Sequence, residues 1–434
     1  MIPLPGSIAV GPIVVGLPRV VWLLAAGSVA VTLPICARQA TDGSNITVAL
    51  VTFGPGEIYW ERFGHNGIWI RDPELGFDSI FDYGRFNFAE PGFIWNFVKG
   101  RMEYSIGSAS ARRYIEYYQS VNRTIWVQEL NLTLTQKIAL RDFLVWNNRP
   151  ENQRYRYHYF YDNCSTRVRD ALDAVIAGGL HPQLDTLDVG VTFRSHSLRL
   201  SSYNLALYTG LLIGLGSPTD RELTASAESF IPMRLMEHLR TVTNVMDDGV
   251  VVPLVASEQI VFESTRDVPP ERPPRFYVVY LLGGILLAGI MGALSVLAAR
   301  GPHMRWPFTT FAVLWSLLLG VSGSLLVFLW AFTDHNTSYW NENLFFLSPL
   351  ALPVAVALPF ALRGKIAATR WAVYSAGVIA LLSVLGCALQ VLPGFDQANG
   401  QVVALFLPPN VVLLIGIIAV LGHPGRRQSL TSTA

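Results

Sequence analysis

Five apolar segments after residue 275 constrain the fold of this chain more than any other feature. Each is long enough, as a helix, to cross a hydrocarbon core of about 30 Å, and a helix satisfies its own backbone hydrogen bonds where water is absent. The sequence therefore predicts a bundle of five transmembrane helices. The segments cover approximately residues 276–299, 307–332, 344–362, 371–392 and 402–422.

The positive charges between these segments predict how the bundle lies in a membrane. The first and third connections and the C-terminal tail carry seven Lys and Arg residues, whereas the second and fourth connections carry none. Because cytoplasmic loops are enriched in Lys and Arg, we expect the C-terminus in the cytoplasm and the residues before the first span outside it. The seven are Arg300, Arg305, Arg363, Lys365, Arg370, Arg426 and Arg427.

The rest of the chain divides into segments of different composition. Residues 1–37 are apolar apart from Arg19, and they are interpreted either as a signal peptide cut near Ala37 or as an uncleaved anchor. Residues 38–265 predict an exported α+β domain large enough for its own core. A proline-rich linker (266–275), the transmembrane bundle (276–422) and a cytoplasmic tail (423–434) complete the predicted order.

Charge and spacing exclude several kinds of partner. The formal net charge is +1 without any basic block, which gives no electrostatic footprint for nucleic acid. No His or Cys pair has the spacing of metal ligands, and no glycine-rich loop is followed by a phosphate-binding lysine. We therefore expect no metal, no nucleotide and no other cofactor.

The first part of the exported domain is predicted to be β structure, and the remainder is predicted to contain both helices and strands. Alternating apolar residues predict a strand at 46–53 and a hairpin whose arms are 64–72 and 80–88. Helices are predicted at 110–118, 135–146 and about 219–243, a strand at 125–130 and a strand pair at 251–264. The apolar run 205–216 is too short to span, and we expect it to dip into the membrane interface, to line an acyl groove or to pack in the core.

The stretch YRYHYFYDNCSTRVRDALDAVIAGG, residues 155–179, holds the candidate nucleophile. A strand-like aromatic run leads to Asp162 and Asn163, either of which can cap a helix that Gly178 and Gly179 close. Cys164 then lies in the first turn, where free backbone N–H groups and the helix dipole favour the thiolate. It is the only cysteine of the exported domain, so no partner within that domain is available for a disulfide.

A thiol nucleophile needs a base and a group that orients the base. Of the five histidines in the exported domain, His65 is the favoured base because it begins a predicted strand between Gly64 and Gly67. Asp82 is the natural third residue, since its strand is expected to pair with that of His65. The register of a hairpin cannot be read from sequence, so Tyr83 remains an alternative.

Several motifs resemble the Lnb family of bacterial lipoprotein N-acyltransferases. They are FGHNGIWIRDP with FDSIFDYGRFNF, YFYDNCSTRVRD, and TDHNTSYWNENLFFLSP in the second connection. The resemblance implies transfer of an acyl chain from a phospholipid to the α-amino group of a lipoprotein's lipidated N-terminal cysteine. It also implies that Cys164 is the nucleophile and His65 the base. The order of His, Asn and Cys is similar to lecithin:retinol acyltransferase, which implies a papain-like, permuted NlpC-like α+β core.

Substrate-binding residues are expected around these positions and at the mouth of the bundle. Arg167 is placed to pair with a donor phosphate, although pairing with Asp170 or Asp173 is the alternative. In the second connection we expect the polar side chains to bind a head group or close the site, with interfacial anchoring as the alternative. The full set of expected binding residues is Tyr83, Asn163, Arg167, His335, Asn341 and Asn343.

The favoured interpretation is therefore a thiol acyltransferase of the bacterial inner membrane, multi-pass, with its catalytic domain on the periplasmic side. The expected partners are a phospholipid donor, a lipoprotein acceptor and the membrane itself. Two alternatives remain open from the residues alone: a cysteine hydrolase or amidase acting on peptidoglycan or lipid, and a non-enzymatic membrane scaffold.

Overall fold

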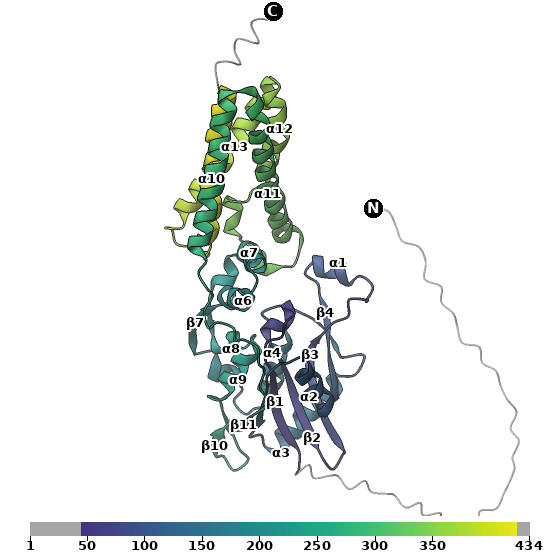
Figure 1. The fold of residues 1–434 in the computed structure, drawn as a ribbon. Coiled ribbons are helices and arrows are strands. Elements are labelled where there is room, and N and C mark those ends of the chain that lie inside the picture. Colours follow the sequence, from purple (N-terminus) through teal and green to yellow (C-terminus); the bar gives the residue numbers. More distant parts are fainter. Residues whose placement is uncertain (1–44, 423–434) are drawn as a thin grey trace, which may run out of the picture. The chain divides into compact units, whose positions relative to one another are not determined.

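The computed structural model describes residues 45–422, in which a mixed α/β domain is followed by five long apolar helices (Figure 1). The predicted fold class, an α+β domain fused to a helical transmembrane bundle, is confirmed at this level. The signal or anchor at 1–37, Cys36 and the tail at 423–434 lie outside the described residues.

A seven-stranded antiparallel sheet organises the α/β domain, in the order β11-β5-β1-β2-β3-β4-β6. Its strands are β1 (Thr47–Phe53), β2 (His65–Asp72), β3 (Phe77–Arg85), β4 (Glu103–Ser110), β5 (Ile125–Leu130), β6 (Arg154–Arg156) and β11 (Val255–Phe262). The predicted hairpin is the pair β2–β3, in which Gly67 lies opposite Asp82. Strand β1 is buried along nearly its whole length, because helices cover both faces of the sheet.

Two apolar clusters form the cores on the two faces. On one face, helix α2 (Ala111–Ser120) packs Tyr114 and Tyr118 against Phe53 of β1. On the other face, α3 (Leu134–Asn147), α4 (Cys164–Asp173) and α9 (Pro232–Leu239) pack against the same strands, with Val168 and Leu172 of α4 fully buried. Helix α4 is therefore held to the sheet by its apolar side.

Short elements fill the chain between α4 and the linker, and here the sequence prediction is partly wrong. The single helix predicted over 219–243 is instead η2 (Ser217–Asp220), β8 (Glu222–Thr224), α8 (Ala225–Glu228) and α9. A proline at the start of α9 begins a new helix, which explains the break. The predicted strands in 251–264 are β10 (Val251–Pro253) and β11, but they pair with β9 (Thr243–Val245) and β5 rather than with each other.

The remaining short elements lie between the predicted ones. They are η1 (Tyr59–Phe63), α1 (Phe93–Val98), α5 (His181–Leu184), β7 (Asp188–Thr192), α6 (Phe193–Ser201) and α7 (Leu205–Gly214).

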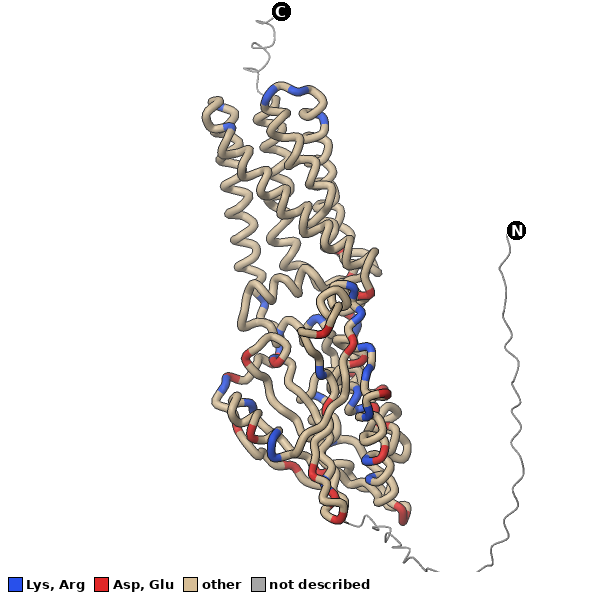
Figure 2. The backbone as a smooth tube through the Cα atoms, turned by 90° about the vertical axis from the view of Figure 1, so that its right-hand side faces the viewer, with Lys and Arg blue, Asp and Glu red and all other residues tan. Residues whose placement is uncertain are grey.

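Five helices are long and apolar enough to cross a membrane: Tyr277–Arg300, Pro302–Phe332, Glu342–Leu362, Ile366–Leu389 and Gly400–Gly422. They contain α10 (Tyr277–Arg300), α11 (Arg305–Phe332), α12 (Leu352–Leu362), α13 (Ile366–Leu389) and α14 (Gly400–Gly422), with the turns η3 (Pro302–Met304), η5 (Glu342–Phe345) and η6 (Pro349–Ala351). Figure 2 shows Lys and Arg at the end of the bundle remote from the sheet, and almost none along the helices. This asymmetry is typical of a bundle whose sheet domain faces away from the cytoplasm.

The apolar run 205–216 becomes α7, which packs into the core of the bundle. Tyr208 and Leu212 belong to the same buried cluster as residues of α10 and α14, and the Tyr208 hydroxyl donates to the Pro274 carbonyl over 2.9 Å. Of the three alternatives for this run, core packing is therefore the one that the structure favours. Helix α7 thus joins the α/β domain to the bundle.

Candidate functional site

Cys164 is the first residue of α4, and Asn163 caps that helix. The Asn163 Oδ1 accepts the backbone N–H groups of Ser165 and Thr166 at 2.9 and 3.0 Å, and the Thr166 hydroxyl accepts the Asn163 N–H at 2.7 Å. This reciprocal capping box explains why the chain turns into a helix at this residue. It holds the thiol at a fixed helix start.

A second contact fixes α4 beside the start of β2. The Asn66 side chain, which is fully buried, donates to the Ser165 hydroxyl over 3.1 Å, and that hydroxyl donates to the Ser229 carbonyl over 2.6 Å. Asn66 follows His65 and Ser165 follows Cys164, so this bond brings the two candidate catalytic residues together. Sequence reasoning missed both residues, although each adjoins a residue that it selected.

His65 lies between Cys164 and Asp82. Its Nε2 is 2.8 Å from Asp82 Oδ2, and the imidazole is within hydrogen-bonding reach of the Cys164 side chain. Asp82 is buried and also accepts from Arg85 Nε at 2.7 Å. The Cys164 thiol, the His65 imidazole and the Asp82 carboxylate therefore form one connected row.

The electrostatics of this row favour a protonated imidazole. Burial alone lowers the pKa of His65, but the negative charge at Cys164 and the hydrogen bond and charge of Asp82 outweigh it and raise the pKa to about 9. Burial likewise acts to raise the pKa of Asp82, yet the bond from His65 and the charges of His65 and Arg85 hold it below its usual value. Asp82 therefore stays ionised and His65 carries a proton at neutral pH.

Gly84 makes room for Cys164. Its φ of +91° lies in a region that L residues rarely adopt, and a Cβ placed there would stand 3.2 Å from the Cys164 Cβ. A glycine at this point of β3 therefore lets the strand pass directly beneath the thiol.

Gly84→Ala is accordingly expected to cost about 1–3 kcal/mol of folding stability and to slow alkylation of Cys164 by iodoacetamide. Gly76→Ala is the matched control, because Gly76 in the turn of the same hairpin has a φ of +63° and nothing within 4 Å of an added Cβ. Gly76→Ala should lose stability through its strained backbone, whereas the rate of Cys164 alkylation should not change. Equal alkylation rates in the two variants would contradict the contact.

Aromatic rings surround the sulfur, and sequence reasoning did not assign them to the site. Tyr118 of α2 lies with its ring centroid 6.4 Å from that of His65. Tyr155 and Tyr157 are half-buried near the thiol: burial raises their pKa values first, and the charge at Cys164 raises them further. The available signal was the alternation of tyrosines in YRYHYFY, which places Tyr155 and Tyr157 on the same side of an extended chain.

The predicted binding residues next to the nucleophile have local partners. Tyr83 is buried, with its hydroxyl donating to Asn147 Oδ1 at 2.8 Å, so it points away from His65. The Asn163 amide donates to the Tyr159 and Phe230 carbonyls, each at 2.9 Å. Arg167 binds Asp162, rather than the carboxylates considered from sequence, and stacks over the Tyr155 ring.

The predicted binding residues of the second connection hold other parts of the chain. His335 Nε2 donates to the Phe97 carbonyl at 2.9 Å. Asn341 donates to the carbonyls of Ile213 and Gly214, and Asn343 to those of Leu212 and Ile213. The two asparagines therefore satisfy the carbonyls at the C-terminus of α7, which no helical partner can reach.

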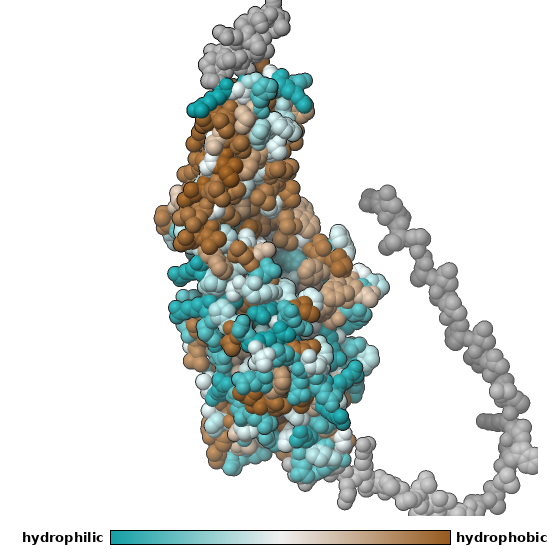
Figure 3. Space-filling model, in the orientation of Figure 1, coloured by the Kyte–Doolittle hydropathy of each residue, from teal (hydrophilic) through white to brown (hydrophobic). Residues whose placement is uncertain are grey.

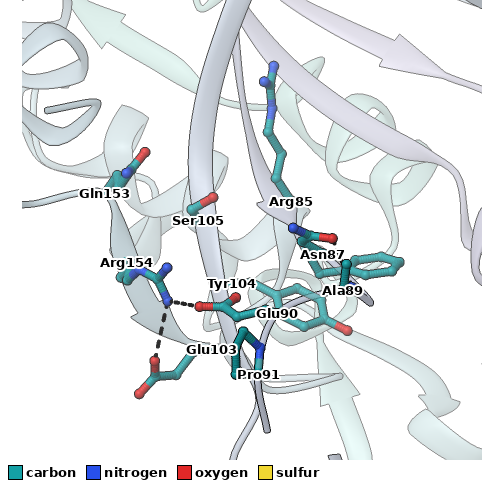
Figure 4. Close-up of a pocket in the computed structure, with 11 residues that line it drawn as sticks. Arg85, Asn87, Ala89, Glu90, Pro91, Glu103, Tyr104, Ser105, Gln153 and Arg154 are labelled. Atoms are coloured by element: carbon teal, nitrogen blue, oxygen red, sulfur yellow. Dashed lines mark hydrogen bonds and ion pairs between the residues drawn. The ribbon is translucent and has the colours of Figure 1, made fainter. Parts of the chain in front are cut away.

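Two cavities lie near the row. One, of about 440 Å³, is bordered by Arg85, Tyr104 and Arg154 (Figure 4), and the Arg154 guanidinium pairs there with Glu90 and Glu103. Because Arg85 also binds Asp82, this arginine connects the lining of the cavity to the carboxylate end of the row.

The second cavity, also of about 440 Å³, lies between the segment before Cys164 and the second connection. Tyr157 and Asp162 border it on one side, and Asp334 and Asn336 on the other. The second connection therefore does border a cavity next to the segment that precedes Cys164, but through residues other than those predicted.

The other histidines of the domain have structural partners. His196 and His238 both bind Glu228, through Nε2 atoms 2.8 and 2.7 Å from its carboxylate oxygens. His158 Nε2 lies 2.7 Å from Asn336 Oδ1. Between residues 45 and 422, no group of three or more His, Cys, Asp or Glu side chains is arranged to hold a metal ion.

Comparison with known families identifies the chain. Residues 36–197, which contain Cys164, His65 and Asp82, match the model of the Lnb N-terminal periplasmic domain, and residues 281–395 match that of the Lnb transmembrane domain. Searches of curated proteins and of solved structures gave no match, so the papain-like kinship of the core stays a prediction. With an Lnb periplasmic domain followed by an Lnb transmembrane domain, this chain belongs to the Lnb family.

Proposed function

We propose that this protein is a membrane-bound thiol acyltransferase. It moves a fatty acyl chain from a phospholipid, through a thioester on Cys164, to the α-amino group of a lipoprotein's N-terminal lipidated cysteine. The observation that carries the proposal is the row in which a cysteine at a helix start lies beside an imidazole held by a buried carboxylate. The membership of the Lnb family supports it.

The first half-reaction uses the charges of this row. The Cys164 thiolate attacks the carbonyl carbon of the donor ester, a C–S bond forms and the C–O bond breaks. His65 gives its proton to the departing glycerol oxygen. We assign the backbone N–H of Cys164, which the Asn163 cap does not use, to the oxyanion of the intermediate.

The second half-reaction depends on the loss of the negative charge at Cys164 in the first. The charge at Cys164 is the largest influence that raises the pKa of His65, and a thioester carries no such charge. His65 is neutral after giving its proton to the glycerol oxygen, and with its pKa lowered it stays neutral and can take a proton from the attacking amine. The C–N bond forms, the C–S bond breaks, and the thiolate and imidazolium return.

The membrane location fits substrates that both reside in a bilayer. A wall hydrolase needs only a tether, whereas here five apolar helices adjoin the catalytic domain. We assign the protein to the bacterial inner membrane, with the catalytic domain on the periplasmic side, because Lys and Arg gather at the opposite end of the bundle.

Mass spectrometry tests the function and the donor together. The full-length protein is incubated in liposomes with a diacylated lipoprotein and a phospholipid that carries isotope-labelled acyl chains. We expect the label on a Cys164 peptide as a thioester, and then as an amide on the lipoprotein, which gains a third chain.

Other outcomes of this experiment have distinct meanings. An unlabelled amide on a lipoprotein that still has two chains would keep the chemistry but make the lipoprotein's own glycerolipid ester the donor. Labelled free fatty acid without any amide would indicate a hydrolase. The absence of both thioester and amide would rule out the proposed function.

A further inference from the structure

The segment from Phe86 to Val98 presents an unusual amount of apolar side chain to its surroundings. Ile94 is 64% exposed and Trp95 60% on helix α1, and Phe88 before it is 58% exposed. Trp60 of η1, 50% exposed, lies against Phe88. Figure 3 shows apolar surface gathered over α1. We call residues 86–98 together with Trp60 the apolar tip.

The apolar tip is fixed to the end of a membrane-spanning helix. The Asp334 backbone N–H donates to the Lys99 carbonyl at 2.8 Å, and the Asp334 carboxylate accepts from Arg101 at 2.8 Å and Arg156 at 2.6 Å. A Cβ on Gly100 would lie 2.8 Å from the Asp334 carbonyl carbon, so the two backbones touch.

These contacts set the depth of the tip. Asp334 follows the last residue of α11, Phe332, by only two positions, and Phe332 is itself 72% exposed. Because α11 crosses the membrane, its end marks the extracytoplasmic surface. Helix α1, which is bonded to the residues directly after that end, therefore lies at the level of the lipid head groups.

The chemistry of α1 suits this depth. Its sequence FIWNFV holds no acidic residue, and the Lys99 ammonium that follows it stands 4.8 Å from the centre of the Trp95 ring. Aromatic rings accompanied by a basic side chain are typical of the interface between hydrocarbon and head groups. Among the possible occupants of this surface, a lipid leaflet fits better than a protein, since the adjoining bundle already requires one there.

A row of aromatic rings leads from the tip toward the thiol. Centroid distances along it are 5.0 Å from Phe88 to Phe86, 5.0 Å from Phe86 to Tyr104 and 4.2 Å from Tyr104 to Tyr157. The Tyr157 ring is close enough to Cys164 that the charge at the sulfur, after burial, contributes to its raised pKa. The ring contacts are continuous from Phe88 to Tyr157, and the faces of the rings offer an apolar surface along which an acyl chain can lie.

We propose that the apolar tip inserts into the outer leaflet beside the bundle and that the aromatic row from Phe88 to Tyr157 guides a lipid acyl chain to Cys164. The inference that the tip inserts depends only on its contacts to Asp334 and on the exposure of its apolar side chains. The guiding role rests on the proposed function, since it needs an acyl donor that reacts at the sulfur.

Photo-crosslinking tests insertion without any need for catalysis. The full-length protein is placed in liposomes whose phospholipid carries a photoreactive group in its acyl chain, and crosslinked peptides are identified by mass spectrometry. We expect crosslinks in residues 86–98 as well as in the five spans, and none at Trp146 of α3, which is 48% exposed on the α/β domain. Spans crosslinked without residues 86–98 would overturn the proposal, whether the tip faces water or a protein partner.

Trp95→Glu tests whether insertion of the tip is needed to bring the acyl chain to the aromatic row, with Trp146→Glu as matched control. We expect Trp95→Glu to lose the crosslinks of residues 86–98 and to form the Cys164 thioester from membrane phospholipid about tenfold more slowly. Alkylation of Cys164 by iodoacetamide should stay at the wild-type rate, which shows that the site is intact. Trp146→Glu should match the wild type in all three measurements.

The possible results separate this proposal from the proposed function. Crosslinks in residues 86–98 without any thioester, even in the wild type, would support the inserted tip and refute the acyltransferase. A normal rate of thioester formation in Trp95→Glu would refute the guiding role and leave the acyltransferase standing.

Discussion

Cys164→Ala is expected to abolish both the acyl-thioester and lipoprotein N-acylation, with a loss of at least about 10⁴-fold in rate. No other side chain in the row can replace the sulfur, because His65 and Asp82 act on a proton rather than on the donor carbonyl. The fold should survive, since the Asn163 cap and the bond from Asn66 to Ser165 that hold α4 do not involve the thiol.

Cys387→Ala provides the control within the same chain. Cys387 is a free, exposed cysteine in α13, away from the α/β domain. That variant should keep full activity and should still be labelled by a lipid donor at Cys164. Mass spectrometry of lipoprotein N-termini, with thermal unfolding of each purified variant, measures both effects. N-acylation that persists in Cys164→Ala would remove the sulfur from the mechanism.

The sequence was sufficient for the parts of the site that depend on local patterns. A capping residue before Cys164 and period-two alternation around His65 and Asp82 are short-range signals, and the structure has a helix start and a hairpin at these positions. The choice between Asp82 and Tyr83 stayed open because a slip of one residue exchanges the two faces of a strand. The pairing of Gly67 with Asp82 puts the carboxylate on the imidazole's side, with Tyr83 on the other.

Residues of the second connection could not be interpreted from sequence for a different reason. Asn341 and Asn343 look like binding residues because they are polar and lie beside apolar spans. Their partners are carbonyls of α7, more than a hundred positions away in the chain, and only the fold reveals that this short helix ends at the mouth of the bundle. Long-range satisfaction of a helix terminus leaves no local pattern.

The second cavity and the apolar tip could not be predicted either, because they too depend on contacts between residues that are far apart in the sequence. Nothing in the sequence links Lys99 to Asp334. A backbone hydrogen bond between them nevertheless brings the end of α1 to the end of α11. Exposure is likewise a property of the folded chain, so FIWNFV in α1 looks like an ordinary core helix until Ile94 and Trp95 are seen to be largely exposed.

Asp82→Asn is expected to change the pH dependence of thioester formation in a definite direction. In the wild type, His65 holds its proton up to a pKa of about 9, so the rate should fall as the pH rises through that value, because the glycerol oxygen then leaves without a proton. The Asp82 hydrogen bond and charge both raise this pKa. An amide removes the charge, so the fall in rate must move to lower pH.

The size of the effect follows from the role of the carboxylate. At neutral pH the variant should form the thioester about 10²-fold more slowly, within the range that general acid–base groups contribute. His65→Gln should be slower than Asp82→Asn and should show no such alkaline fall. Single-turnover measurements with labelled donor isolate this half-reaction from the ionisation of the acceptor amine.

The protonation of His65 should also affect the stability of the fold. Because the folded pKa of His65, about 9, exceeds its ordinary value of 6.5, this group stabilises the fold fully below about 6.5 and loses that contribution as the pH rises through 9. The wild type should therefore lose thermal stability over this interval, and His65→Gln should lose less. The rate measurements decide the role of Asp82. If the rate of thioester formation falls at the same pH in Asp82→Asn as in the wild type, the carboxylate does not control the imidazole, and the row is not a catalytic relay.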